Sequence, residues 1–259
     1  MIKNILTALK AYGSSFKLMR ELGLWKYFLV PMGISLLFAV VIGFAAYGLS
    51  DNLAGPLARL WIWETGSDTF TAFAEILSAI VIVIFGLLLY KHFVMAFSAP
   101  FMSPVSEKIE KHLYPELQGS ITHRDTTNAA QLSRGIRINV RNLIYELLLT
   151  IPLLLLSLIP VVGVLFWVIG FLVQSYYAGF GNMDYTLERH FKYRESVDFV
   201  KAHRGFAIGN GIVFNAVLLI PIIGIILVLP VSVTAASKAT LELLQQQKLL
   251  TDPVTGITV

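Results

Sequence analysis

The stretch from Leu153 to Phe171 reads LLLLSLIPVVGVLFWVIGF, nineteen residues without a charge. A helix of this length is about sufficient to cross the hydrocarbon core of a bilayer. Pro160 and Gly163 stand near its centre, however, and they are residues typical of a turn. Proline removes a helical hydrogen-bond donor, and glycine permits positive φ. The same motif returns 61 residues later, where LIPIIG at 219–224 matches LIPVVG at 158–163.

Each motif lies at the centre of an apolar block, 143–179 and 206–236, with charged segments on both sides. An excess of Lys and Arg marks the cytoplasmic side, so each block must leave the bilayer on the side where it entered. We therefore expect two helical hairpins, each with Gly at a positive φ. Arms of about 14 residues in the second block give roughly 21 Å of helix, which suits partial insertion. The first block has arms of about 16 or 17 residues. The alternative, two kinked single spans, would break the charge asymmetry.

Composition places the chain in the membrane. Of 259 residues, 56% are hydrophobic and 14% are charged, and the mean hydropathy is +0.72. A soluble domain carries about 25% charged residues. The 20 Lys and Arg lie in several short segments rather than on one soluble face, which argues against a nucleic-acid partner. We expect a single all-α integral membrane domain over 1–259.

The remaining segments complete this prediction. Residues 1–26 form an amphipathic interfacial helix, and 28–49 and 70–101 form transmembrane helices joined by an outward-facing loop. Lys91 and His92 interrupt the second span and are expected outside the hydrocarbon. Polar helical segments at 102–142 and 180–205 lie on the cytoplasmic side, and 237–259 forms a tail. In 180–205 we expect a solvated helical face whose charges pair with one another.

Enzymatic chemistry lacks support in the sequence. There is no cysteine, the five histidines show no metal-ligand spacing, and there is no Gly-x-Ser-x-Gly motif. We predict no catalytic residue, no metal site and no cofactor.

Several strings, in order along more than 200 residues, resemble the CysZ-like family of bacterial sulfate permeases. They are GLWKYFLVP (23–31), SAPFMSPVSEKIEKHL (98–113), GNMDYTLERH (181–190) and the stretch from Ala202 to Thr240. The resemblance implies two long transmembrane helices, two partially inserted hairpins, a polar portion outside the bilayer and a homo-oligomer of two or more subunits. It also implies a bacterial inner-membrane location and sulfate uptake for cysteine synthesis. The chain departs from the family pattern at Trp25, where the family has Arg, and at Thr186, where it often has Pro.

The GLWK string is a candidate sulfate site. A helix start presents free N–H groups and a positive dipole end, so a glycine-led turn beside a cation can hold an oxyanion. The predicted site comprises backbone donors and nearby cations: Gly23, Leu24, Trp25, Lys26 and Arg20. The alternative is that the cations bind lipid phosphates while Trp25 marks the interface.

Two further groups of charges form a candidate ion path or a structural network. Glu107 and Glu110 lie beside lysines, and we favour a structural role for them. Arg134, Arg137 and Arg141 fall on one helical face. These arginines could line an anion entrance, bind anionic lipid or pair with the glutamates, and the sequence does not distinguish these three roles. Two polar side chains in the second block, Asn210 and Asn215, suit interhelical hydrogen bonds better than a polar path.

The sequence thus favours a sulfate permease or channel. Two alternatives stay open: a membrane-shaping scaffold with no permeant, or a channel for another oxyanion.

Overall fold

The computed structural model describes residues 1–59, 67–117, 124, 127–220 and 223–250, and every regular element in those ranges is a helix. The all-helical prediction is confirmed for this part of the chain. The elements are α1 (Ile2–Glu21), α2 (Trp25–Ala58), α3 (Ser67–Leu113), the 3-10 turn η1 (Pro115–Leu117), α4 (Asn128–Leu156), α5 (Gly163–His190), α6 (Tyr193–Ala202), α7 (Arg204–Leu218) and α8 (Ile223–Gln246).

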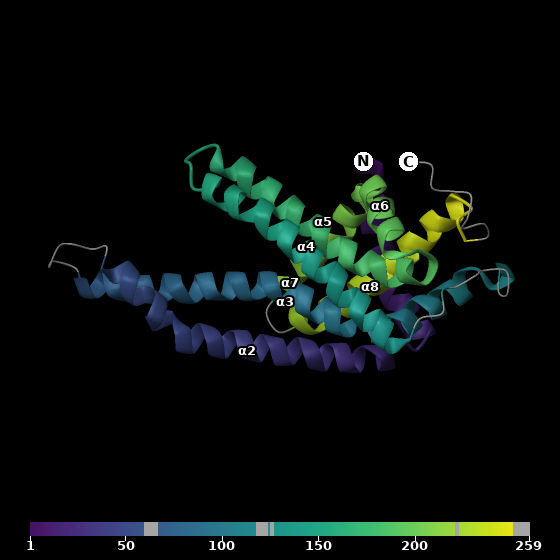
Figure 1. The fold of residues 1–259 in the computed structure, drawn as a ribbon, viewed down its shortest axis with the longest axis horizontal. Helices are drawn as coiled ribbons and strands as arrows, with labels where there is room; N and C mark the ends of the chain where they lie inside the picture. The colour runs from purple at the N-terminus through teal and green to yellow at the C-terminus, as the bar shows by residue number, and fades with distance from the viewer. Residues whose placement is uncertain (60–66, 118–123, 125–126, 221–222, 251–259) are drawn as a thin grey trace.

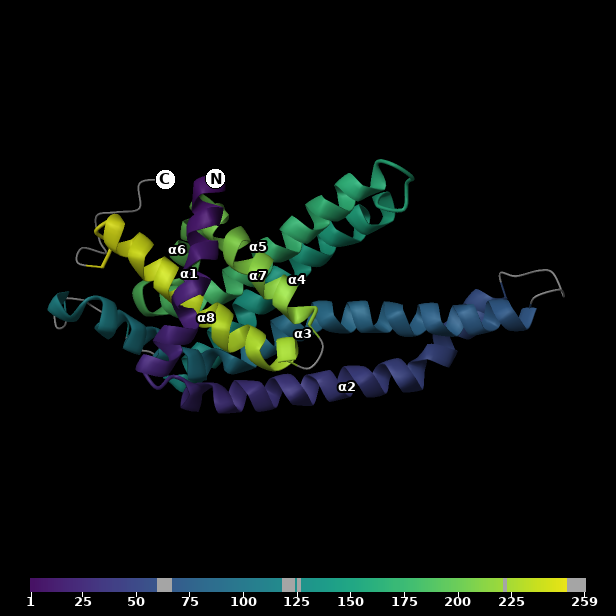
Figure 2. The same cartoon turned by 180° about the vertical axis from the view of Figure 1, so that it is seen from behind.

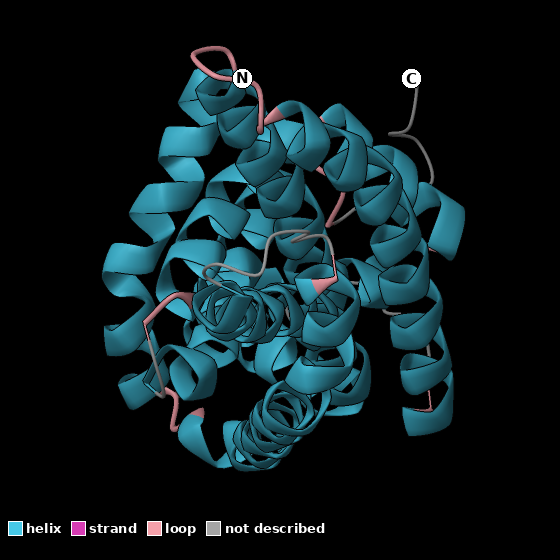
Figure 3. Ribbon diagram, turned by 90° about the vertical axis from the view of Figure 1, so that its left-hand side faces the viewer, coloured by secondary structure: helices cyan, strands magenta, loops and turns pink. Residues whose placement is uncertain are grey.

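Two helical arms diverge from one compact bundle (Figure 1). The first arm consists of α2 and the N-terminal half of α3, which lie side by side in both views (Figures 1 and 2). The second arm consists of the C-terminal half of α4 and the N-terminal half of α5. The bundle contains α1, α6, α7, α8 and the inner ends of α3, α4 and α5, so that helices from the whole chain meet there (Figure 3).

In the part of the chain that the structure describes, five helices are long and apolar enough to cross a membrane: α2, α3, α4, α5 and the 226–246 part of α8. The two in the first arm extend beyond the predicted spans. α3 has 47 residues, roughly 70 Å of helix, whereas the hydrocarbon core is about 30 Å thick. It continues without a break through the polar residues to Leu113, because that part packs in the bundle and buries Met102, Val105 and Ile109. Most large apolar side chains of the first arm, including Leu37 and Ile76, are exposed.

The opening stretch forms two helices, α4 and α5, joined by a turn at 157–162. The ends of this hairpin meet, since the Arg124 N–H donates to the Arg189 carbonyl oxygen at 2.9 Å. The expected positive φ at Gly163 is wrong: Val161 takes it instead, at 71°. Gly163 is required for a different reason, because a Cβ there would collide with the Ser157 carbonyl oxygen.

The second hairpin joins α7 to α8. α7 has 15 residues, close to the predicted arm, but α8 has 24 and runs into the bundle. Pro221 of the repeated motif lies outside the described residues. Gly224 has no positive φ, so that expectation is also wrong, and a Cβ there would collide with the Val217 carbonyl oxygen. Both glycines of the repeat therefore allow close backbone approach at the start of a returning helix.

α1 packs on α7 and α8, and its buried face holds small side chains together with Leu18 and Met19 near its C-terminal end. Ala8, Ala11 and Ser15 are buried, whereas Leu6 and Phe16 are exposed. The exposed apolar stripe of α1 suits a membrane interface, as expected for an amphipathic helix.

Candidate functional site

The turn between α1 and α2 carries the predicted oxyanion site. Gly23 adopts φ of 59°, and its N–H donates to the Arg20 carbonyl oxygen at 3.3 Å. The Leu24 N–H donates to the Met19 carbonyl oxygen at 2.9 Å. This pattern is a Schellman cap that ends α1, for which glycine is the favoured residue. Both N–H groups are therefore engaged in capping and are not available to an anion as predicted. The nearest backbone N–H groups that do not cap α1 are those of the first turn of α2.

Trp25 and Lys26 are the first two residues of α2, and their N–H groups precede the first intrahelical hydrogen bonds. The turn anchors them in place, because the Leu24 and Phe28 side chains are fully buried. Trp25 and Lys26 are themselves exposed. The start of α2 thus presents two backbone donors and the positive end of a 34-residue helix to the surroundings.

A second lysine joins this turn from α3. The Lys26 Nζ lies 5.2 Å from the centre of the Tyr27 ring, and the Lys108 Nζ lies 5.5 Å from it. Lys108 is half-buried and also donates to the Leu22 carbonyl oxygen at 3.5 Å. Two ammonium groups therefore flank one aromatic ring at the α2 N-terminus. Arg20 is exposed on the last turn of α1. Lys108 and Tyr27 were not among the predicted site residues, since 82 residues separate Lys26 from Lys108 in the sequence.

The two predicted glutamates have different surroundings. Glu110 is buried, with Oε2 3.1 Å from both Arg189 Nη2 and His190 Nε2. Glu107 is half-exposed and pairs with Lys111 one turn further along α3, at 2.5 Å. The expected solvated face of 180–205 is wrong at its α5 end. Asp184, Glu188, Arg189 and His190 are buried there against other helices.

The three predicted arginines pair with neither Glu107 nor Glu110. Arg134 binds Asp184 through two hydrogen bonds, of 3.1 and 2.8 Å, and also donates to the Phe191 carbonyl oxygen at 2.7 Å. Arg137 stacks on the Tyr193 ring at 4.1 Å, and Arg141 lies 5.4 Å from the centre of the Phe180 ring. A cavity of about 260 Å³ adjoins this group. Its lining includes Arg124, Gln131, Arg134, Arg137, Glu188 and Tyr193.

A third polar group lies between α3 and α4 and was not predicted. Lys91 Nζ is 2.5 Å from Glu146 Oε1, and His92 Nε2 is 2.9 Å from Glu146 Oε2. All three residues are at most 2% exposed. Lys91 and His92, which we expect outside the hydrocarbon, are thus buried within the protein, where Glu146 of α4 pairs with both of them. Glu146 is a charged residue inside the apolar run 143–156, and this feature of the sequence could have indicated the buried polar group.

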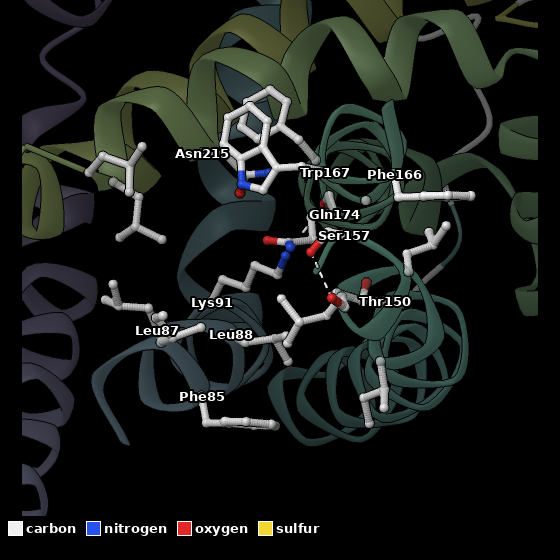
Figure 4. A pocket seen from close by; sticks show the side chains of 18 residues that line it. Phe85, Leu87, Leu88, Lys91, Thr150, Ser157, Phe166, Trp167, Gln174 and Asn215 are labelled. Atoms are coloured by element: carbon white, nitrogen blue, oxygen red, sulfur yellow. Dashed lines mark hydrogen bonds between the residues drawn. The ribbon is translucent and has the colours of Figure 1, made fainter. Parts of the chain in front are cut away.

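Lys91 also borders the second cavity, of about 300 Å³, where the two arms diverge (Figure 4). Figure 4 shows its amino group directed towards the space between Gln174 and Asn215, with Thr150 and Ser157 nearby. The Lys91 Nζ lies 3.4 Å from the Gln174 carbonyl oxygen. Apolar side chains from α3, α4, α5 and α7 form most of the lining. The expectation for Asn210 and Asn215 is confirmed, since both make interhelical hydrogen bonds, to Asn182 and Ser175.

Comparison with known proteins agrees with this arrangement. Residues 11–228 match the family model described as sulfate transporter CysZ/etoposide-induced protein 2.4. The chain belongs to this family. Curated relatives named sulfate transporter CysZ, from Pseudomonas paraeruginosa and Pseudomonas aeruginosa, are 26% identical over 234 residues, covering 87% of this chain and 90% of theirs. The resemblance expected from the sequence is confirmed.

Membership of the CysZ family identifies a multi-pass membrane protein of a transporter class rather than an enzyme. The match includes the α1–α2 turn, the α3–α4 charge group and the whole first hairpin, so each of these sites lies in the part shared with the family.

Proposed function

We propose that this CysZ-family chain carries sulfate across the bacterial inner membrane for assimilation into cysteine. The observation that carries the proposal is the convergence of Lys26, Lys108 and the free N–H groups of α2 at one turn. The names of the Pseudomonas relatives supply the choice of sulfate among oxyanions.

The chemistry of this turn suits a permeating dianion. Sulfate loses hydration when it leaves bulk water, and backbone N–H groups and ammonium groups replace part of that shell. Lys26 is exposed and Lys108 only half-buried, so the anion keeps some water and is not trapped. Such intermediate binding is what conduction requires. Arg124 and Arg137 border the cavity on the bundle, and their positive charges would raise the local concentration of anions there.

We further propose that several protomers together form the passage. The two arms expose apolar side chains over much of their surface, which lipid or other protomers must cover. Partially inserted hairpins leave turn backbone groups that need protein or water as partners. An oligomer that surrounds a water-filled gap satisfies both requirements.

The test is sulfate uptake by liposomes that contain the purified protein, with labelled sulfate outside. We expect uptake well above that of protein-free liposomes, and weaker sulfate binding in Lys26→Gln and Lys108→Gln. Lys201→Gln is the matched control, because Lys201 is an exposed lysine on α6 that pairs only locally with Asp198. Uptake equal to that of protein-free liposomes would exclude transport. Lipid remodelling without flux would instead identify a scaffold, and stronger competition by thiosulfate or molybdate would identify another oxyanion.

A further inference from the structure

The smaller cavity, on the bundle, has charges of both signs in its wall. Arg134 and Arg137 come from α4, Glu188 from the end of α5 and Tyr193 from the start of α6, and Arg124 precedes α4. The volume of about 260 Å³ is slightly below the range of about 300–1,000 Å³ typical of sites for drug-sized ligands. The cavity therefore suits a small polar metabolite rather than a nucleotide.

Glu188 is the negative group in this wall, and it lacks a partner. The residue is 2% exposed, and neither carboxylate oxygen makes a hydrogen bond or an ion pair with any residue that the structure describes. Arg134 does not compensate it, because its guanidinium binds Asp184 one turn earlier on α5. Water supplies hydrogen bonds but no positive charge, so a buried carboxylate of this kind favours a cationic group that enters the cavity.

Two arginines in the same wall have donors to offer an anionic group. Arg137 stacks the face of its guanidinium on the Tyr193 ring at 4.1 Å, which leaves the N–H groups at its edge directed outwards. Arg124 is held by its Nη1, which donates to the Glu188 carbonyl oxygen at 3.2 Å and to the Phe191 carbonyl oxygen at 2.8 Å. Neither guanidinium forms an ion pair within the described part of the chain, so both can receive a carboxylate.

The balance of charge in the wall defines the class of ligand. Arg134 and Asp184 neutralise each other, which leaves the two positive charges of Arg124 and Arg137 and the one negative charge of Glu188. A complementary solute has two carboxylates and one ammonium group. Sulfate has no cationic group, and Glu188 would repel it.

We propose that this cavity binds an acidic α-amino acid, with its ammonium group on Glu188 and its carboxylates on Arg124 and Arg137. The site is separate from the turn between α1 and α2, and it does not depend on which anion the protein carries. A ligand held in this way joins the start of α4 to the end of α5 at the bundle end of the first hairpin. Binding to the folded state alone would also raise the unfolding temperature.

The experiment is calorimetric titration of the purified full chain in detergent, in buffer without sulfate. L-Aspartate is the probe. Succinate is the same molecule without the ammonium group, and β-alanine is the same molecule without the α-carboxylate. We expect saturable binding of L-aspartate, and binding about tenfold weaker for succinate and β-alanine, since each loses one charge-assisted contact.

Two variants test the assigned contacts. Arg137→Gln should weaken L-aspartate binding about tenfold. Glu188→Gln should remove the preference for L-aspartate over succinate, and it should fold, because the Glu188 carboxylate makes no bond to a described residue. Arg194→Gln is the matched control for Arg137→Gln, since Arg194 is an exposed arginine on α6 that does not line the cavity.

The outcomes separate clearly. Absence of saturable L-aspartate binding would overturn the proposal, and so would succinate binding as tight as that of L-aspartate. Equal losses in Arg137→Gln and Arg194→Gln would show a non-specific charge effect and would also overturn it. Sulfate uptake does not enter these titrations, so a failure of sulfate transport alone leaves the proposal standing.

Discussion

Glu146 on α4 and Lys91 on α3 form a buried ion pair, with Oε1 and Nζ 2.5 Å apart and 55 residues between them in the sequence. Each of these two charges has lost its hydration, and the opposite charge of its partner is the main interaction that replaces it. The pair, together with His92, fastens the inner ends of the two arms to one another.

The first prediction concerns this pair. Glu146→Gln leaves the Lys91 ammonium buried without a counter-charge, and such a loss costs about 3–5 kcal/mol. We expect a clearly lower thermal unfolding temperature in detergent. The double variant Lys91→Met/Glu146→Leu should recover much of the loss, since it removes both charges. A double variant as unstable as the single one would contradict this account.

The second prediction concerns Arg134. Its guanidinium makes two hydrogen bonds to Asp184, one to the Phe191 carbonyl oxygen and one to the Ser196 hydroxyl. Lysine cannot reproduce this fork, so Arg134→Lys should lose about 2 kcal/mol of stability. Arg137→Lys is the control, because Arg137 is exposed and stacks on a single ring. Equal shifts of the unfolding temperature in the two variants would show that the hydrogen bonds of the Arg134 guanidinium stabilise the protein no more than the ring contact of Arg137.

The third prediction concerns the turn of the first hairpin. Val161 has φ of 71°, which is unfavourable for a β-branched residue, and its side chain is exposed. Val161→Gly should therefore be neutral or stabilising by up to about 1 kcal/mol. Gly163→Ala should destabilise, because its methyl group meets the Ser157 carbonyl oxygen. Thermal unfolding of both variants measures the contrast, and the reverse order would refute this geometry.

The fourth prediction concerns the membrane path of the same hairpin, and the absence of native cysteine makes it accessible. Thr127 precedes α4 and Lys192 follows α5, both at the bundle end of the hairpin, so a membrane-impermeant thiol reagent should label Thr127→Cys and Lys192→Cys from the same side. Val161→Cys at the turn should resist that reagent if the hairpin tip enters lipid. Labelling of positions 127 and 192 from opposite sides would exclude a hairpin.

The fifth prediction concerns Gly23. Its φ of 59° closes the Schellman cap, and a Cβ there costs about 1–2 kcal/mol although no neighbouring atom obstructs it. Gly23→Ala should therefore shift the start of α2 and weaken sulfate binding without a loss of Lys26 or Lys108. Calorimetric titration with sulfate is the measurement, and Gly13→Ala, an unobstructed glycine inside α1, is the control. Unchanged sulfate affinity in Gly23→Ala would show that the conformation of the cap does not affect anion binding.

The arrangement of the candidate site was only partly predictable. Glycine at 23 and lysine at 26 indicated an anion site because both features are local in the sequence. The cap that engages the Gly23 N–H, and the arrival of Lys108 from α3, depend on how α1, α2 and α3 pack. The partners of Arg134 and Glu110 likewise lie 50 and 79 residues away.

The sequence by itself determined the membrane class, the helical fold and the reversal of the chain at 157–162, because hydropathy, helix length and turn chemistry are properties of neighbouring residues. Tertiary structure decided how far each helix extends, why Gly163 is glycine, and which charges meet. Burial is the physical reason. Lys91, His92 and Glu146 interrupt apolar runs and look like interfacial residues in the sequence, yet they become a buried polar group when α3 and α4 close on one another.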